Sequence, residues 1–251
     1  MSVGILFVIL FGVALGSFLN VIVIRFPDKP ITGRSFCPKC KKKLRAIDLI
    51  PLISYILIRG RCVNCRKRIS IQYLLVELVV GIVAVTVFMS YLNGVVGLVG
   101  SLVNFFIIYI LIGLFLIDLR TFLLPDLYIV MLTGLVVLNM IIVSSSIALA
   151  FVGALIGAGF LLILWIITAR RGIGLGDVKL MIPLGFLFGP VNTVLLLLGS
   201  FILGGSVGLV LLASKKATLK TAVPFGPFLA GVAILFVLFP DIPAYLLEFI
   251  V

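Results

Sequence analysis

Long stretches without a single charged residue recur along most of this chain, and they constrain its fold more than any other feature of the sequence. A run of about 18 or more apolar residues is long enough to cross the hydrocarbon core of a bilayer as a helix. With 63% hydrophobic and 11% charged residues, the chain is too apolar for an ordinary soluble domain. The sequence therefore predicts an all-α, polytopic membrane protein.

The apolar runs predict about eight membrane segments and one soluble insert. The segments are expected at 3–24, 73–92, 97–117, 126–143, 147–169, 178–189, 191–213 and 223–247. The first lacks a basic region before it and a cleavage site after it, so we expect it to be retained. The sixth is short for a span, which favours a tilted or re-entrant segment. The expected domains are a first helix (1–24), an insert (25–72) and a bundle (73–251).

Positive charge lies on alternate connections between these segments. Of 20 Lys and Arg residues, 13 fall in the insert. The other basic residues are Arg120, Arg170, Arg171, Lys179, Lys215, Lys216 and Lys220. The intervening connections, near residues 91–94, 144–146 and 189–192, contain none. Because basic loops stay on the cytoplasmic side of a membrane, the pattern predicts an external N-terminus and a cytoplasmic insert.

All four cysteines lie in the insert, in the two CxxC pairs Cys37/Cys40 and Cys62/Cys65. Four thiolates can complete a tetrahedral zinc site, and each pair places two sulfurs on one tight turn. A redox role lacks the surrounding βαβ pattern, and disulfides are unusual in the reducing compartment that the charge pattern predicts. We therefore expect one structural zinc ion in a zinc-ribbon-like fold.

The basic insert has two candidate anionic partners. A zinc ribbon can bind nucleic acid, but only Phe26, Phe36 and Tyr55 offer rings that stack on bases. Anionic lipid headgroups lie within reach of the same charges, because membrane segments flank the insert on both sides. We expect the insert to rest on anionic lipid and not to bind nucleic acid.

The chain has no histidine, so its acid–base chemistry depends chiefly on eight carboxylates. Ser-His and Cys-His nucleophile pairs and His-containing metal sites are excluded. Asp28 and Asp48 belong to the insert, and Asp241 and Glu248 lie near the C-terminal end. Glu77 lies one turn inside the second segment, where we expect a nearby Lys or Arg as its partner.

The remaining three aspartates are predicted at one depth, on the side marked by positive charge. Asp118 ends the third segment, Asp126 begins the fourth, and Asp177 follows a glycine-rich turn before the sixth. Two carboxylates held close can share one proton, so that one activates water while the other polarises a peptide carbonyl. This pattern favours an aspartyl hydrolase. Asp126 also has a structural alternative, because negative charge stabilises a helix N-terminus.

Two other functions use the same features. A proton- or cation-coupled transporter would hold its carboxylates near the bilayer centre on broken helices, whereas here they are predicted at one face. A non-enzymatic membrane anchor that displays a zinc ribbon would tolerate replacement of the carboxylates.

The order of motifs resembles that of the bacterial prepilin peptidases (type IV leader peptidases), which are membrane aspartyl proteases of the Gly-x-Gly-Asp class. Besides the paired CxxC insert, the matching motifs are Gly16-Ser-Phe-Leu-Asn-Val, Asp48-Leu-Ile-Pro-Leu-Ile-Ser-Tyr55, Arg59-Gly-Arg-Cys62, Leu124-Pro-Asp126, Gly174-Leu-Gly-Asp177-Val-Lys-Leu180 and Pro224-Phe-Gly-Pro-Phe228. They run nearly from end to end of the chain.

The resemblance implies that Asp118 and Asp177 form the catalytic pair. The supporting positions that it implies are Asp126, Gly174, Gly176 and Lys179. It implies cleavage of the short basic leaders of pilins and secretion-system pseudopilins, at the cytoplasmic face of the bacterial inner membrane. It further implies N-methylation of the new N-terminus with S-adenosylmethionine, an activity associated with the position of Gly60.

Overall fold

The computed structural model describes residues 2–28, 30, 32–37, 39–168, 172–215, 218 and 221–250. Throughout these ranges the regular structure is helical, with two isolated β-bridges and no strand, which confirms the all-α prediction. Five basic residues that contributed to the predicted orientation lie outside the described residues: Lys29, Arg170, Arg171, Lys216 and Lys220.

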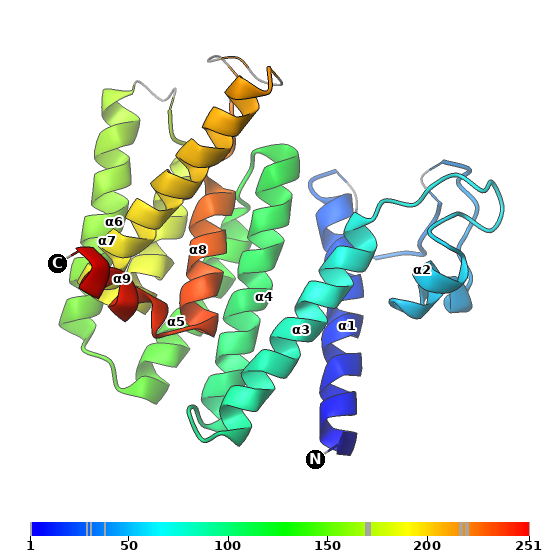
Figure 1. The fold of residues 1–251 in the computed structure, drawn as a ribbon, viewed down its shortest axis with the longest axis horizontal. Helices are drawn as coiled ribbons and strands as arrows, with labels where there is room; N and C mark the ends of the chain where they lie inside the picture. Colours follow the sequence, from blue (N-terminus) through cyan, green and yellow to red (C-terminus); the bar gives the residue numbers. More distant parts are fainter. Residues whose placement is uncertain are drawn as a thin grey trace. The chain divides into compact units, whose positions relative to one another are not determined.

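The chain forms two compact units, Met1–Val95 and Val96–Val251 (Figure 1). The helices of the first unit are α1 (Ser2–Arg25), the 3-10 helix η1 (Ala46–Leu49), α2 (Ile53–Leu57) and α3 (Gln72–Leu92). Those of the second unit are α4 (Leu98–Thr121), α5 (Asp126–Val143), α6 (Ile147–Ile167), α7 (Leu175–Ala213), α8 (Gly226–Leu238) and α9 (Ile242–Ile250). This division differs from the expected domains, because α3 belongs to the compact unit that contains α1 and the insert.

Small residues bring α1 and α3 into direct backbone contact. A Cβ added at Gly16 would lie 2.8 Å from the Cα of Glu77, and one added at Gly12 would lie 3.1 Å from the Cα of Gly81. Glycines four residues apart occupy one face of a helix and leave room for the neighbouring backbone. The two helices therefore form a tight pair that flanks the insert in sequence.

Six helices of the described chain are long and apolar enough to cross a membrane: α1, α3, α4, α5, α6 and α7. The axes of α8 and α9 differ by 101° at a short break, and counting this bent pair as one span brings the number to seven. The predicted count of eight is therefore not confirmed. The last predicted segment, 223–247, is broken because the chain bends between α8 and α9.

The long helix α7 reverses direction at Gly189, where the backbone is non-helical (φ 67°, ψ −177°). Met181 precedes this residue and Thr193 follows it, yet both side chains contact Gly157 of α6, lying 2.5 and 2.8 Å from the position of an added Cβ. In a straight helix these two residues would be about 18 Å apart along the axis. The sixth and seventh predicted segments are therefore two arms that fold back on α6 without a polar loop between them.

The core of the second unit forms around α4, which is more deeply buried than the other candidate spans. Leu111, Leu114 and Ile117 of α4 are fully buried, as are Leu229 and Ala230 of α8. The helices α4 and α8 also pack against each other. Because protein interiors are close-packed, this packing holds the last turn of α4 in place relative to the first turn of α8. That corner of the unit contains the carboxylates.

Candidate functional site

Asp118 and Asp177 meet at one corner of the second unit. Asp118 lies in the last turn of α4 and Asp177 in the first turn of α7, and they are only 5% and 6% exposed. A Cβ added at Gly226 would lie 2.5 Å from Oδ2 of Asp118 and 3.2 Å from Oδ1 of Asp177. The two oxygens can be no farther apart than the sum of these distances. The carboxylates are thus close enough to exchange a proton directly or through one water molecule.

Each of the two buried carboxylates faces a backbone N–H. The N–H of Gly174, at the start of α7, donates to Oδ2 of Asp177 at 3.0 Å. The N–H of Gly226, the first residue of α8, is directed at the carboxylate of Asp118. The first N–H groups of a helix have no partner inside the helix, so they are available to an acceptor of this kind. Two helix N-termini thereby orient the pair.

Leu124 is an apolar neighbour of the pair. It lies beside Gly176, where an added Cβ would be 3.0 Å from the Cβ of Leu124. Its Cδ1 is 3.2 Å from the Cβ position of Gly226. Sequence reasoning assigned no role to Leu124 or Gly226. The sequence feature that could have pointed to Gly226 is its place between an aromatic residue and a proline, at the start of a helix, in Pro224-Phe-Gly-Pro-Phe228.

Asp126 interacts with Lys179 rather than with the buried pair. It is the first residue of α5, and both of its carboxylate oxygens accept hydrogen bonds from Nζ of Lys179, at 2.8 and 3.0 Å. The two side chains are 69% and 50% exposed. An ion pair this exposed contributes about 1 kcal/mol or less to stability. These two predicted supporting residues therefore link the starts of α5 and α7 at the surface.

The four cysteines of the insert form one cluster in the first unit. Their sulfur atoms all lie within 4.8 Å of one another, and all four thiols are free of disulfide bonds. Sγ of Cys37 is 3.9 Å from that of Cys65, and Sγ of Cys40 is 4.0 Å from that of Cys62. Four sulfurs in a tetrahedron at about 2.3 Å from zinc are about 3.8 Å apart. The cluster can therefore hold a metal ion of this type.

Both CxxC pairs lie on backbone turns of the same design. The N–H of Cys37 donates to the carbonyl of Lys42, and the N–H of Cys62 donates to the carbonyl of Lys67, each at 3.0 Å. The residue after the second cysteine of each pair has a positive φ, 56° in one turn and 53° in the other. Such paired turns present two sulfurs each, which explains how short spacing builds a four-sulfur cluster.

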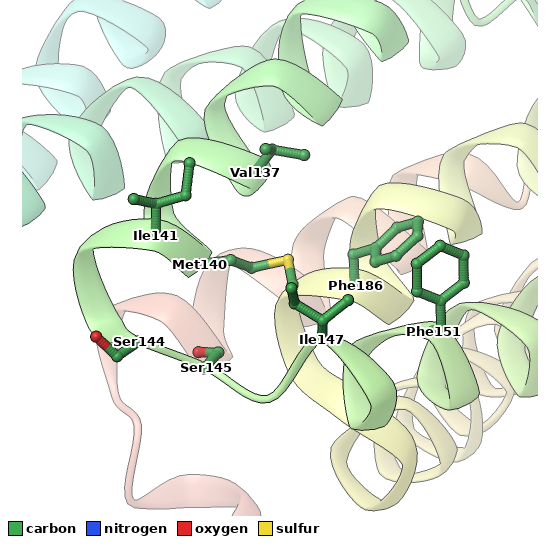
Figure 2. Close-up of a pocket in the computed structure, with 8 residues that line it drawn as sticks. All are labelled: Val137, Met140, Ile141, Ser144, Ser145, Ile147, Phe151 and Phe186. Carbon is green, nitrogen blue, oxygen red and sulfur yellow. The ribbon is translucent and has the colours of Figure 1, made fainter.

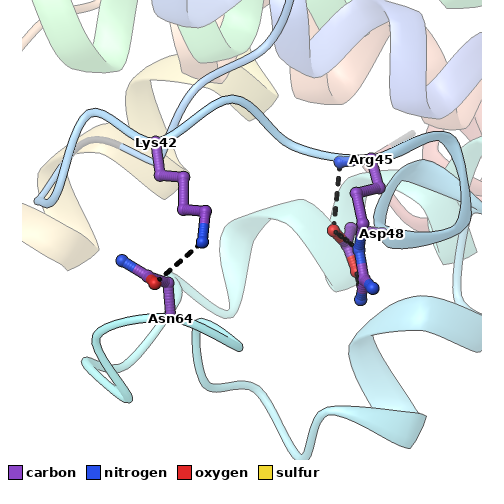
Figure 3. Close-up of polar contacts among 4 residues, drawn as sticks. All are labelled: Lys42, Arg45, Asp48 and Asn64. Carbon is purple, nitrogen blue, oxygen red and sulfur yellow. Dashed lines mark hydrogen bonds and ion pairs between the residues drawn. The ribbon is translucent and has the colours of Figure 1, made fainter.

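Polar contacts join and brace the insert (Figure 3). Nζ of Lys42 donates to Oδ1 of Asn64 at 3.1 Å and so connects the two cysteine turns. The backbone N–H and the Nε of Arg45 donate to Oδ2 of Asp48, at 3.0 and 3.1 Å, around η1. Hydrogen bonds from Arg45 lower the pKa of Asp48, so this carboxylate is ionised at neutral pH.

The surroundings of the thiols favour an uneven distribution of charge. The backbone N–H of Lys42 and the side chain of Asn64 lower the pKa of Cys40 to about 6. The backbone N–H of Lys67 acts in the same direction on Cys65, but burial and the neighbouring thiols outweigh it and raise the pKa to about 11. Once one thiol has ionised, the ionisation of its neighbours is unfavourable because the negative charges repel one another. A bound cation would stabilise all of the thiolates.

Among the residues that the structure describes, Glu77 is paired with neither Lys nor Arg. It is 6% exposed, and its Oε2 accepts a hydrogen bond from the backbone N–H of Leu52 at 2.8 Å. The hydroxyl of Ser17 is a second partner. The expected pairing with Lys or Arg is therefore wrong for the described contacts. Glu77 instead satisfies a backbone amide at a residue with a positive φ of 59°, where the insert enters α2.

Gly60 lies in a turn of the insert that only glycine fits. Its φ is 64°, and an added Cβ would lie 2.9 Å from both Cζ and Oη of Tyr55. The hydroxyl of Tyr55 donates to the carbonyl of Ile69 at 3.3 Å, which places the ring over the turn. Any side chain at position 60 would strain the backbone and displace the ring.

A cavity of about 590 Å³ lies elsewhere in the second unit (Figure 2). Its lining residues are Val137, Met140, Ile141, Ser144, Ser145, Ile147, Phe151 and Phe186, none of which is charged. The helix α5 is about 27 Å long, with Asp126 at its beginning and several of the lining residues at its end. The cavity is therefore separate from the carboxylate site.

Comparison with known proteins divides the chain in the same way as its structure. The profile of the Bacterial Peptidase A24 N-terminal domain matches residues 10–91, within the first unit. The profile of the Type IV leader peptidase family matches residues 105–209, within the second unit. No solved structure matches the chain.

Several curated relatives are similar over most of the chain, and each is named "Prepilin leader peptidase/N-methyltransferase". The protein of Aeromonas hydrophila is 33% identical, over 89% of this chain and 86% of its own length. The protein of Pseudomonas putida is 34% identical, over 92% and 88%. The protein of Legionella pneumophila is 33% identical, over 88% and 86%.

Proposed function

We propose, because this chain belongs to the type IV leader peptidase family, that it is a membrane aspartyl endopeptidase and N-methyltransferase. Its substrates are type IV prepilins and pseudopilins, whose basic leaders it removes before methylating the new N-terminus. The observation that carries the peptidase function is the pair of buried carboxylates, Asp118 and Asp177, that contact one side of Gly226.

The proposed reaction uses the two carboxylates as a unit that holds one proton. The ionised member takes a proton from water as the water oxygen attacks the scissile carbonyl. The protonated member donates its proton to the carbonyl oxygen. Collapse of the resulting tetrahedral diol breaks the C–N bond. The carboxyl group that took the proton from water now protonates the departing amine, and the other carboxylate takes a proton from a diol hydroxyl, which restores the single shared proton. Burial limits access of bulk water, which strengthens these electrostatic interactions.

The position of the carboxylates argues against a transporter. Asp118 lies in the last turn of a 24-residue helix, and Asp177 lies in the first turn of α7. A transporter would place its ion-binding carboxylates near the middle of the span. A non-enzymatic anchor gives no reason for two buried carboxylates to meet, since burying charge is costly.

The function is tested by incubating the purified full-length protein with a purified prepilin, with and without S-adenosylmethionine. Intact-mass measurement separates the two activities. We expect loss of the leader in both cases, and addition of one methyl group only when the methyl donor is present. An unchanged prepilin mass would contradict the peptidase function, and cleavage without methylation would remove only the second activity.

We also propose that the cysteine cluster binds one structural zinc ion. The sulfur–sulfur distances of 3.9 and 4.0 Å support this, as does an all-thiolate donor set. Cys37, Cys40, Cys62 and Cys65 would hold the ion. Zinc bound by four protein ligands has no open position, so it stabilises the insert and takes no part in peptide cleavage.

We propose that the protein lies in the bacterial inner membrane, that its insert is on the cytoplasmic side, and that the insert rests on anionic lipid. Its 13 basic and two acidic residues support this contact. We expect the full-length protein, purified in mild detergent, to retain anionic phospholipid, and a variant with Lys41, Lys42 and Lys43 changed to Gln to retain less. Lipid analysis measures this. Equal retention of neutral and anionic lipid by both proteins would contradict the proposal.

Gly60→Ala is expected to abolish methylation and to leave cleavage intact. The added methyl group would meet the ring of Tyr55 at 2.9 Å and strain a turn with positive φ. Intact mass of the product should therefore show a cleaved but unmethylated pilin. Gly33→Ala is the matched control, because Gly33 also has a positive φ (110°) and none of the described residues lies within 4 Å of its Cβ position. Loss of methylation in both variants would mean that general strain, rather than Tyr55, is responsible.

Asp126→Asn and Lys179→Met are expected to reduce the cleavage rate by about tenfold at most, since an exposed ion pair contributes about 1 kcal/mol. The double variant should resemble the single variants, because each removes the same interaction between α5 and α7. Steady-state cleavage of a prepilin measures the effect. Complete loss of activity in Asp126→Asn would instead place Asp126 in the catalytic machinery.

A further inference from the structure

Gly226 fits its position because it lacks a side chain, and its backbone conformation does not require glycine. Its φ is outside the left-handed region, so alanine could adopt the same backbone without strain. It is the first residue of α8, a helix of 13 residues, and it is buried. The requirement for glycine is therefore one of space alone.

Groups of the candidate site fill the space next to Gly226. Oδ2 of Asp118 lies 2.5 Å from the Cβ position, whereas Oδ1 of Asp177 and Cδ1 of Leu124 each lie 3.2 Å from it. A carbon and an oxygen cannot approach to 2.5 Å without a severe clash, so one of them must move. The Asp118 carboxylate ends a short side chain and can rotate, whereas α4 and α8 pack against each other and contain fully buried residues.

We propose that Gly226 is a positioning residue of the peptidase site. Its missing side chain leaves the space in which the Asp118 carboxylate lies beside Asp177, and its N–H at the start of α8 orients that carboxylate. The role rests on the proposed function of the carboxylate pair. An alanine at this position turns the carboxylate away from both the N–H and Asp177, while the helices keep their packing.

Gly226→Ala in the full-length protein tests the role by prepilin cleavage. We expect kcat to fall about 100-fold, as for a misplaced catalytic group, with KM unchanged. The pH–rate profile should also change shape, because separated carboxylates no longer share one proton. Gly231→Ala is the control on the same helix, since its Cβ would meet Phe115 alone among the described residues, at an ordinary contact distance of 3.8 Å. Wild-type kcat and pH profile in Gly226→Ala would overturn the positioning role.

Two further variants distinguish the positioning role of Gly226 from the catalytic role of the carboxylate pair and from a folding defect. If Asp118→Asn still cleaves, Asp118 and Asp177 are not the catalytic pair, whatever the activity of Gly226→Ala. If Gly226→Ala is unstable, its thermal unfolding is compared in an Asp118→Ala background, where the clashing oxygen is absent. We expect Gly226→Ala to cause no loss of Tm there. An equal loss of Tm in both backgrounds would show that the glycine serves only helix packing.

Discussion

Asp118→Asn and Asp177→Asn are each expected to lower prepilin cleavage by about 10⁴-fold or more, as when one member of a catalytic unit is removed. Asparagine keeps the size of the side chain but cannot exchange the shared proton. Steady-state cleavage by purified variants measures the loss. The double variant should be little worse than either single variant, because in the proposed mechanism the two carboxylates act together. Membrane insertion and Tm should be close to those of the wild-type protein.

The pH dependence of the wild-type enzyme checks the same pair. The mechanism that we propose requires one proton on the two carboxylates, so the rate should fall in acid, where both are protonated, and in base, where both are ionised. Asp241→Asn is the matched control and should keep the wild-type pH profile, because Asp241 is exposed and lies between α8 and α9. If Asp126→Asn is inactive while Asp118→Asn still cleaves, then Asp177 has been assigned the wrong partner.

One zinc ion per chain is expected in freshly purified, reduced protein, and Cys62→Ser should reduce this to none. Loss of one of four ligands weakens zinc binding strongly, because metal binding and the folding of a small zinc site depend on each other. Elemental analysis measures the content. Limited proteolysis should then cut the insert, while circular dichroism shows that the membrane helices remain. Lys39→Ala, between two ligands, should retain the metal.

A result of no zinc in the wild-type protein would contradict the proposed metal. Zinc that remained at one ion per chain in Cys62→Ser would exclude Cys62 as an essential ligand. The four sulfurs within 4.8 Å of one another lead us to expect neither result.

The sequence by itself determined the helical class, the insert and the residues able to do chemistry. Uncharged runs of 18 or more residues can satisfy their backbone polar groups in lipid only as helices, so their position was readable without tertiary information. Short CxxC spacing fixed which sulfurs share a turn. The absence of histidine limited acid–base chemistry to a few carboxylates. These are local properties of composition and spacing.

Only the tertiary structure decided which of these groups meet. Asp118 and Asp126 are eight residues apart and predicted at one depth, but α4 directs the first toward Asp177 while the second pairs with Lys179. Glu77 accepts a hydrogen bond from a backbone amide, whereas the sequence predicted a basic side chain as its partner. Gly226 has an ordinary backbone, so its role depends on α8 packing against the ends of α4 and α7. Such contacts join residues far apart in sequence, and local periodicity carries no information about them.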